Sequence, residues 1–108
     1  MSKIITSPVP KFAGTVTLSD PLTYPQVIAY ERAVAAVRES ATTLAEMHQA
    51  MLPGLFACVE AWNLAGLPDP VTPENFPATP RVASTKLVSW LVSEVAGLYG
   101  ESEEIPNA

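Results

Sequence analysis

The sequence has few of the side chains from which most active sites and metal sites are built. Its 108 residues include one cysteine, Cys58, and one histidine, His48. A single cysteine excludes a disulfide within the chain and a metal site made of several cysteines, and a single histidine excludes a His-rich metal centre. We therefore expect no metal, no cofactor and no catalytic residues, and we expect that the protein is not an enzyme.

Charge is also scarce, and positive charge most of all. Charged residues make up 16% of the chain, against about 25% in an average globular protein. Six residues are Lys or Arg and eleven are Asp or Glu, which gives a net charge of −5. Because binding to a phosphate backbone depends on basic side chains, the sequence argues against nucleic acid as a partner.

Long hydrophobic runs are missing too. The N-terminal segment has one short apolar run at Ile4 and Ile5, and Pro8 and Pro10 follow it. A signal peptide needs an unbroken apolar run of roughly 7–15 residues, and a membrane span needs about 20. We therefore expect no membrane partner and a cytoplasmic location, in which Cys58 stays reduced.

Apolar residues are plentiful by contrast, at 48% of the chain. This content excludes an intrinsically disordered protein, and the length is that of one domain. A small helical bundle rarely hides so many apolar side chains completely. The composition therefore predicts an apolar surface patch that is available to a partner protein.

One β-strand is predicted over residues 11–19, after an extended arm over residues 1–10. The apolar residues Phe12, Val16 and Leu18 alternate here with small and polar ones, the period of a half-buried strand. A single strand leaves its backbone groups unpaired. These strand-pairing residues must therefore pair either with Lys3–Ser7 or with another chain, and the second alternative implies a homo-oligomer.

Helices are predicted over residues 24–39, 43–65 and 80–99. Thr23 with Gln26, and Thr43 with Glu46, have the spacing of capping boxes. Pro53 is expected to begin or kink a helix, because it cannot donate a hydrogen bond to the preceding turn.

The third predicted helix has Thr79 as its cap and Pro80 as its first residue. An acidic, solvated tail over residues 101–108 follows it. The predicted fold is thus mainly α: a single domain, 1–108, forming a small three-to-four-helix bundle with an N-terminal extended arm and a short β-strand.

Five large side chains are candidates for binding a partner, with the hydrophobic core as the alternative location for each. Met47 and Met51 lie one helical turn apart, and Trp90 lies between the apolar and polar faces of its helix. Flexible thioethers and indoles suit a surface that binds varied apolar partners. The full set is Met47, Met51, Phe56, Trp62 and Trp90.

A small enzyme or regulator built on His48 and Cys58 is a further hypothesis, but the sequence around them is unfavourable. Glu46 lies two positions from His48, on a different helix face. A reactive thiol needs basic neighbours, and the nearest charged residue to Cys58 is Glu60. We therefore interpret His48 as a structural or surface residue and Cys58 as a small buried hydrophobe.

Three blocks and the chain end carry a family resemblance. The blocks are Gly14–Gln26, Leu52–Trp62 and Phe76–Pro80, the last leading into Leu87–Leu91, and the ending is Glu103–Asn107. Together they resemble the tail assembly chaperones of long-tailed bacteriophages over residues 12–106. The blocks are patterns of caps and helices, so the resemblance transfers no individual binding residue.

The resemblance implies a helical, non-enzymatic protein of the host cell cytoplasm. Such chaperones coat the long tape measure protein and recruit tail tube subunits around it. The frameshift extension that many of them carry is not visible in this sequence. The alternative function is a structural virion part, such as a tail or head completion protein, that oligomerises through residues 12–18 or the arm over residues 1–10.

Overall fold

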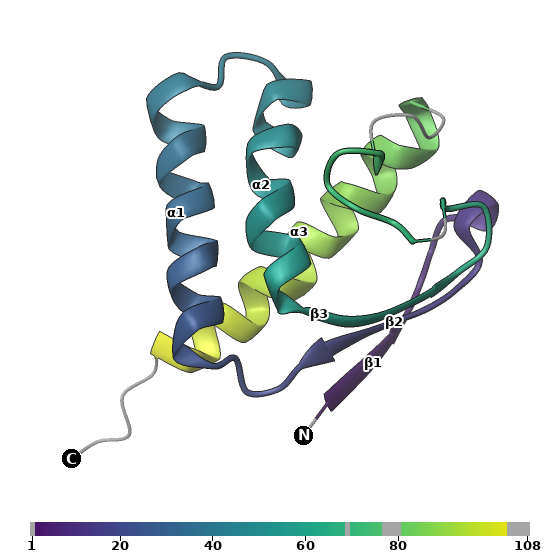
Figure 1. Ribbon diagram of the computed structural model, residues 1–108, viewed down its shortest axis with the longest axis horizontal. Helices are drawn as coiled ribbons and strands as arrows, with labels where there is room; N and C mark the ends of the chain where they lie inside the picture. The colour runs from purple at the N-terminus through teal and green to yellow at the C-terminus, as the bar shows by residue number, and fades with distance from the viewer. Residues whose placement is uncertain (1, 69, 77–80, 104–108) are drawn as a thin grey trace.

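The computed structural model describes residues 2–68, 70–76 and 81–103, and within them the fold is α+β (Figure 1). Three helices pack with a three-stranded antiparallel sheet, so the prediction of a three-to-four-helix bundle is wrong. The elements, in chain order, are β1 (Ser2–Thr6), a short 3-10 helix η1 (Pro10–Phe12), β2 (Gly14–Ser19), α1 (Tyr24–Ser40), α2 (Leu44–Cys58), β3 (Val59–Leu64) and α3 (Arg81–Glu103).

The sheet has the order β1-β2-β3, which places β2 in the centre. The predicted arm forms β1, whose pairing with β2 runs from Ser2↔Ser19 to Thr6↔Thr15. On its other edge β2 pairs with β3, with a register shift next to Leu18. Of the two alternatives for the lone predicted strand, the structure therefore takes pairing within the chain.

The predicted helix over residues 43–65 is wrong in its last third. Helix α2 ends at Cys58 and the chain passes directly into β3 at Val59. The spacing of Leu55, Val59 and Trp62 fits a helix, but pairing with β2 gives the backbone of this segment its hydrogen-bond partners as a strand. Pro53 neither begins nor ends the helix and lies inside it.

The two predicted capping boxes are confirmed. The Thr23 hydroxyl accepts from the Gln26 backbone N–H, and the Gln26 side chain accepts from the Thr23 backbone N–H at 2.8 Å. Thr43 and Glu46 form the same reciprocal pair at the start of α2. Each box supplies partners for backbone N–H groups that the first helical turn leaves free.

The capping residue Gln26 also joins three elements through its amide nitrogen. It donates to the Ser19 hydroxyl at 2.7 Å and to the Ala57 carbonyl at 3.0 Å. The Ser19 hydroxyl in turn donates to the Glu60 carboxylate, which also accepts from the Ser2 hydroxyl. These hydrogen bonds, from Ser2 first and then Ser19, hold the pKa of Glu60 below its usual value.

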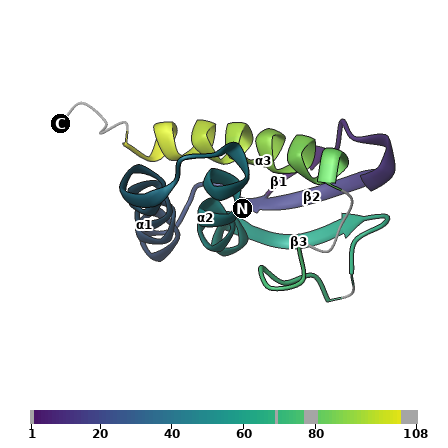
Figure 2. The same cartoon turned by 90° about the horizontal axis from the view of Figure 1, so that it is seen from above.

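Helices α1 and α2 stand side by side and α3 crosses one side of both the helix pair and the sheet (Figures 1 and 2). The helix pair is close because Gly54 has no side chain: a Cβ there would lie 2.8 Å from the Cβ of Ala33. Beneath α3 the core contains Leu55, Leu87 and Leu91, all nearly or fully buried. The crossing of α3 leaves part of the helix pair without a cover, and this part carries the site described below.

Helix α3 differs from its prediction at the C-terminal end. It continues to Glu103, so the segment 101–103, predicted as part of a solvated tail, has a helical backbone. The remainder of that tail, and the predicted cap Thr79 with Pro80, lie outside the described residues.

Replacing Gly14 by alanine should destabilise the fold. Gly14 has φ +134°, a conformation that L side chains rarely adopt, and an added Cβ would collide with the Asn63 carbonyl oxygen on β3. We expect Gly14→Ala to lower the free energy of unfolding by more than about 2 kcal/mol, measured by urea denaturation with circular dichroism.

The matched control is Gly97→Ala in α3, where an added Cβ meets nothing within 4 Å. This change should raise the free energy of unfolding by up to about 1 kcal/mol, because alanine favours a helix over glycine. A Gly14→Ala protein as stable as the unmodified chain would contradict the close contact between β2 and β3.

Candidate functional site

The candidate site is a cavity of about 360 Å³ between the three helices, here called the apolar groove. Its walls are mostly hydrocarbon, with one imidazole and two hydroxyls among the lining groups. The residues are Tyr30, Val34 and Val37 of α1, Leu44, Met47, His48 and Met51 of α2, and Ser89 and Val92 of α3.

The groove exists because two apolar stripes extend beyond the part of the helix pair that α3 covers. The stripe on α1 consists of Tyr30, Val34 and Val37. On α2 the stripe has the spacing i, i+3, i+7 and consists of Leu44, Met47 and Met51, which all face the groove. The exposed fraction falls along it from 53% at Leu44 to 37% at Met47 and 6% at Met51. The beginning of α2 thus presents large apolar side chains to solvent.

A polar pair spans the groove between α2 and α3. The His48 Nε2 atom and the Ser89 hydroxyl oxygen lie 3.3 Å apart. Partial burial lowers the pKa of His48 from its usual value of 6.5, so the ring is neutral at neutral pH. A neutral imidazole is compatible with an apolar occupant of the groove, because no buried charge has to be compensated.

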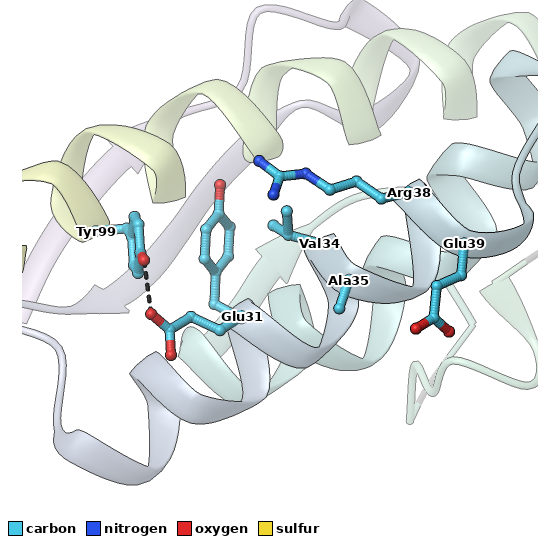
Figure 3. Close-up of a pocket in the computed structure, with 7 residues that line it drawn as sticks. Glu31, Val34, Ala35, Arg38, Glu39 and Tyr99 are labelled. Atoms are coloured by element: carbon cyan, nitrogen blue, oxygen red, sulfur yellow. Dashed lines mark hydrogen bonds between the residues drawn. The ribbon is translucent and has the colours of Figure 1, made fainter.

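A second, more polar cavity of about 680 Å³ continues from the groove along α1 (Figure 3). Here the Tyr99 hydroxyl of α3 donates to the Glu31 carboxylate at 2.7 Å, and the Tyr99 ring lies 4.8 Å from that of Tyr30. Figure 3 shows the Arg38 side chain extending from α1, with Glu39 leaving the same helix in another direction. Charged side chains therefore lie along α1 beside the apolar groove.

The five predicted contact residues are divided between the groove and other places. Met47 and Met51 line the groove. Phe56 and Trp62 pack on each other with ring centroids 4.9 Å apart, and both contact Phe76. Trp90 is half-buried against the core. The structure thus brings together the two methionines and separates them from the three aromatic residues.

The three predicted strand-pairing residues are buried. Val16 and Leu18 lie in β2 with exposed fractions of 0%, and Phe12 belongs to η1 with 1%. Since β2 has a strand on each edge, its backbone is already paired within the chain. Among the described residues, β1 and β3 are the edge strands of the sheet.

Sequence reasoning missed most of the groove. Val34, Val37 and Leu44 have the stripe spacing that predicts a helix face toward a core, and nothing local shows that this face stays uncovered. The signal that could have identified these residues is that both stripes continue to the connection between the first two helices, further than one crossing helix can cover. Tyr30, His48, Ser89 and Val92 complete the set of residues that were missed.

Cys58 is a core residue, as predicted. Its side chain is fully buried, and burial raises the pKa of the thiol to about 11. At neutral pH the thiol is therefore protonated and a poor nucleophile, since the thiolate is the reactive form.

Over the described residues, His, Cys, Asp and Glu form no group of three or more that could hold a metal ion. No helix in the same part of the chain is long and apolar enough to cross a bilayer. No protein-family model, curated protein or solved structure matches this chain. A function for it therefore has to be inferred from the groove.

Acidification through the His48 titration should destabilise the protein. Because the pKa of His48 is lower in the folded state than its usual 6.5, the unfolded chain takes up the proton first as the pH falls. The free energy of unfolding should therefore decrease between pH 7.5 and 5.5, as measured by urea denaturation.

His48 is the single histidine of the chain, and histidine is the side chain whose usual pKa lies in this pH range. His48→Gln should remove the decrease, since glutamine keeps a polar side chain without titrating. An equally steep decrease in His48→Gln would show that another group causes it.

Proposed function

We propose that this protein is a bacteriophage tail assembly chaperone, and that its apolar groove binds segments of the tape measure protein. The observation that carries the proposal is the exposure of Leu44 and Met47 on a face shared by two helices. Monomeric soluble proteins rarely leave a contiguous apolar surface of this kind without a binding role.

The energetics suit reversible binding. Fully burying a leucine or methionine contributes about 1.5–3 kcal/mol, so covering the exposed half of Leu44 and the exposed third of Met47 contributes about 1 kcal/mol each. The half-buried Val34, Val37 and Val92 add smaller amounts. The sum favours a contact that forms and is released again, which an assembly chaperone requires when its client takes up its final structure.

The resemblance of the cap-and-helix blocks to phage tail assembly chaperones supports the same proposal. In this function the protein acts in the cytoplasm of the bacterial host, keeps the tape measure protein soluble, and brings tail tube subunits to it. The groove is lined by the three helices and not by the sheet. In this proposal the tape measure protein binds in the groove.

Co-expression with a tape measure protein tests the proposal. The unmodified chain should raise the soluble yield of that protein. The double variant Leu44→Gln/Met47→Gln should lose most of the gain, because it makes the exposed part of the groove polar while the buried Met51 is kept.

The matched control is Val82→Gln, which makes a more exposed apolar residue polar outside the groove (Val82 is 70% exposed). It should keep the full gain in soluble yield. No gain from the unmodified chain, or the same loss in Val82→Gln as in the groove variant, would refute the proposal.

A second candidate function, a structural virion component that forms oligomers, is favoured by one observation. Strand β1 is an edge strand, and its Ile4 is 69% exposed. An edge of this kind can pair with a strand of another copy.

Light scattering on the purified protein distinguishes the two functions. A stable ring that Ile4→Lys disrupts would support the structural component. A monomer unaffected by Ile4→Lys would contradict it, because a charged edge strand resists pairing between copies.

A further inference from the structure

The apolar groove and the charged cavity form one continuous surface, here called the extended groove. Tyr30 and Val34 line both cavities, so the two adjoin along α1. Along α1 the lining runs from Tyr30 to Glu39, ten residues whose first and last Cα positions are about 13 Å apart along the helix axis. This length corresponds to two and a half helical turns of an occupant that lies alongside α1.

The extended groove suits a helix and does not suit an extended strand. Every described residue that lines it belongs to α1, α2 or α3, whose backbone groups already bond within their helices. An extended segment would thus bury backbone N–H and C=O groups against hydrocarbon without partners, at a high free-energy cost. A helix satisfies these groups itself, and its apolar stripe can pack between the stripes of α1 and α2.

Charge distinguishes the two ends of the extended groove. At the end near Tyr99, the lining includes one carboxylate, that of Glu31, while Arg38 and Glu39 lie about two turns further along α1 and carry opposite charges. Among the described residues that line the apolar groove itself, around Leu44 and Met47, none is Asp, Glu, Lys or Arg.

The carboxylate of Glu31 has a fixed position. It accepts the hydrogen bond from the Tyr99 hydroxyl, and this bond together with the packing of the Tyr99 and Tyr30 rings holds α3 against α1. An ion pair with a side chain that is already held in place loses less conformational entropy than one between two mobile side chains. Glu31 is thus suited to recognise a cation on the occupant.

From these observations we infer that the extended groove binds an amphipathic helix whose apolar stripe lies over Val34, Met47 and Met51 and whose Lys or Arg residues lie at the end near Glu31. This inference rests on the proposed function, because it specifies which segments of the tape measure protein are bound. Such segments have an apolar stripe of two to three turns with a basic residue at one end.

The test uses two helix-stapled, fluorescent peptides of about 14 residues with the same apolar stripe. One peptide has Lys residues at both ends and the other has Glu residues there, so the orientation in the groove does not matter. At low salt the Lys peptide should bind about fivefold more tightly by fluorescence anisotropy, and this preference should shrink as salt screens the charges.

Charge-neutral variants identify the groups responsible. Glu31→Gln keeps an acceptor for the Tyr99 hydroxyl while removing the charge, and it should abolish most of the preference for Lys. The matched control is Glu74→Gln, which removes one exposed charge from the loop outside the groove and should preserve it.

Three outcomes would overturn the inference: equal affinity for both peptides, no binding of either, or a preference that persists in the Glu31→Gln protein. Co-expression reports on the proposed function separately. If the chain solubilises a tape measure protein but binds neither peptide, the inference fails and the proposed function stands. If the Lys peptide is preferred but co-expression gives no gain, the proposed function fails.

Discussion

The pairing of β2 on both of its edges determines most of this fold. A strand in the centre of a sheet needs hydrogen-bond partners for its backbone on each side, and here β1 and β3 supply them. To provide β3, the chain has to leave the helical conformation at Cys58 and return antiparallel to β2. The site of this change fixes where α2 ends.

The features that the sequence predicts well are those with a local chemical cause. Thr23 with Gln26, and Thr43 with Glu46, begin helices because their side chains bond the free N–H groups of the first turn. The alternation around Val16 and Leu18 likewise predicts a strand from its own residues. In each case the pattern and the cause lie within a few positions of each other.

The conversion of residues 59–64 into a strand could not be predicted in the same way. Val59 and Trp62 continue the helical spacing of Leu55, while valine and tryptophan are also common in strands. The choice between the two depends on Gly14–Leu18, more than forty positions earlier, which supplies the pairing partner. Such a nonlocal requirement leaves no mark in the segment itself.

The candidate site shows the same division. Met47 and Met51 could be selected from their spacing and flexibility, and both line the groove. Phe56 and Trp62 are also large and apolar, but both pack with Phe76. Trp62 does so from β3. The angle at which α3 crosses the helix pair decides which apolar residues stay uncovered, and this angle is a property of the whole core.

The direct passage from α2 into β3 has a mechanical consequence. No loop separates Cys58 from Val59, and Gln26 of α1 bonds both Ser19 of β2 and Ala57 of α2, so the helix pair is tied to the sheet at this end. Helices α1 and α2, which together with α3 form the walls of the groove, are therefore preorganised before a partner arrives. A partner that docks there meets a rigid receptor, so the loss of conformational entropy on association falls mainly on the partner.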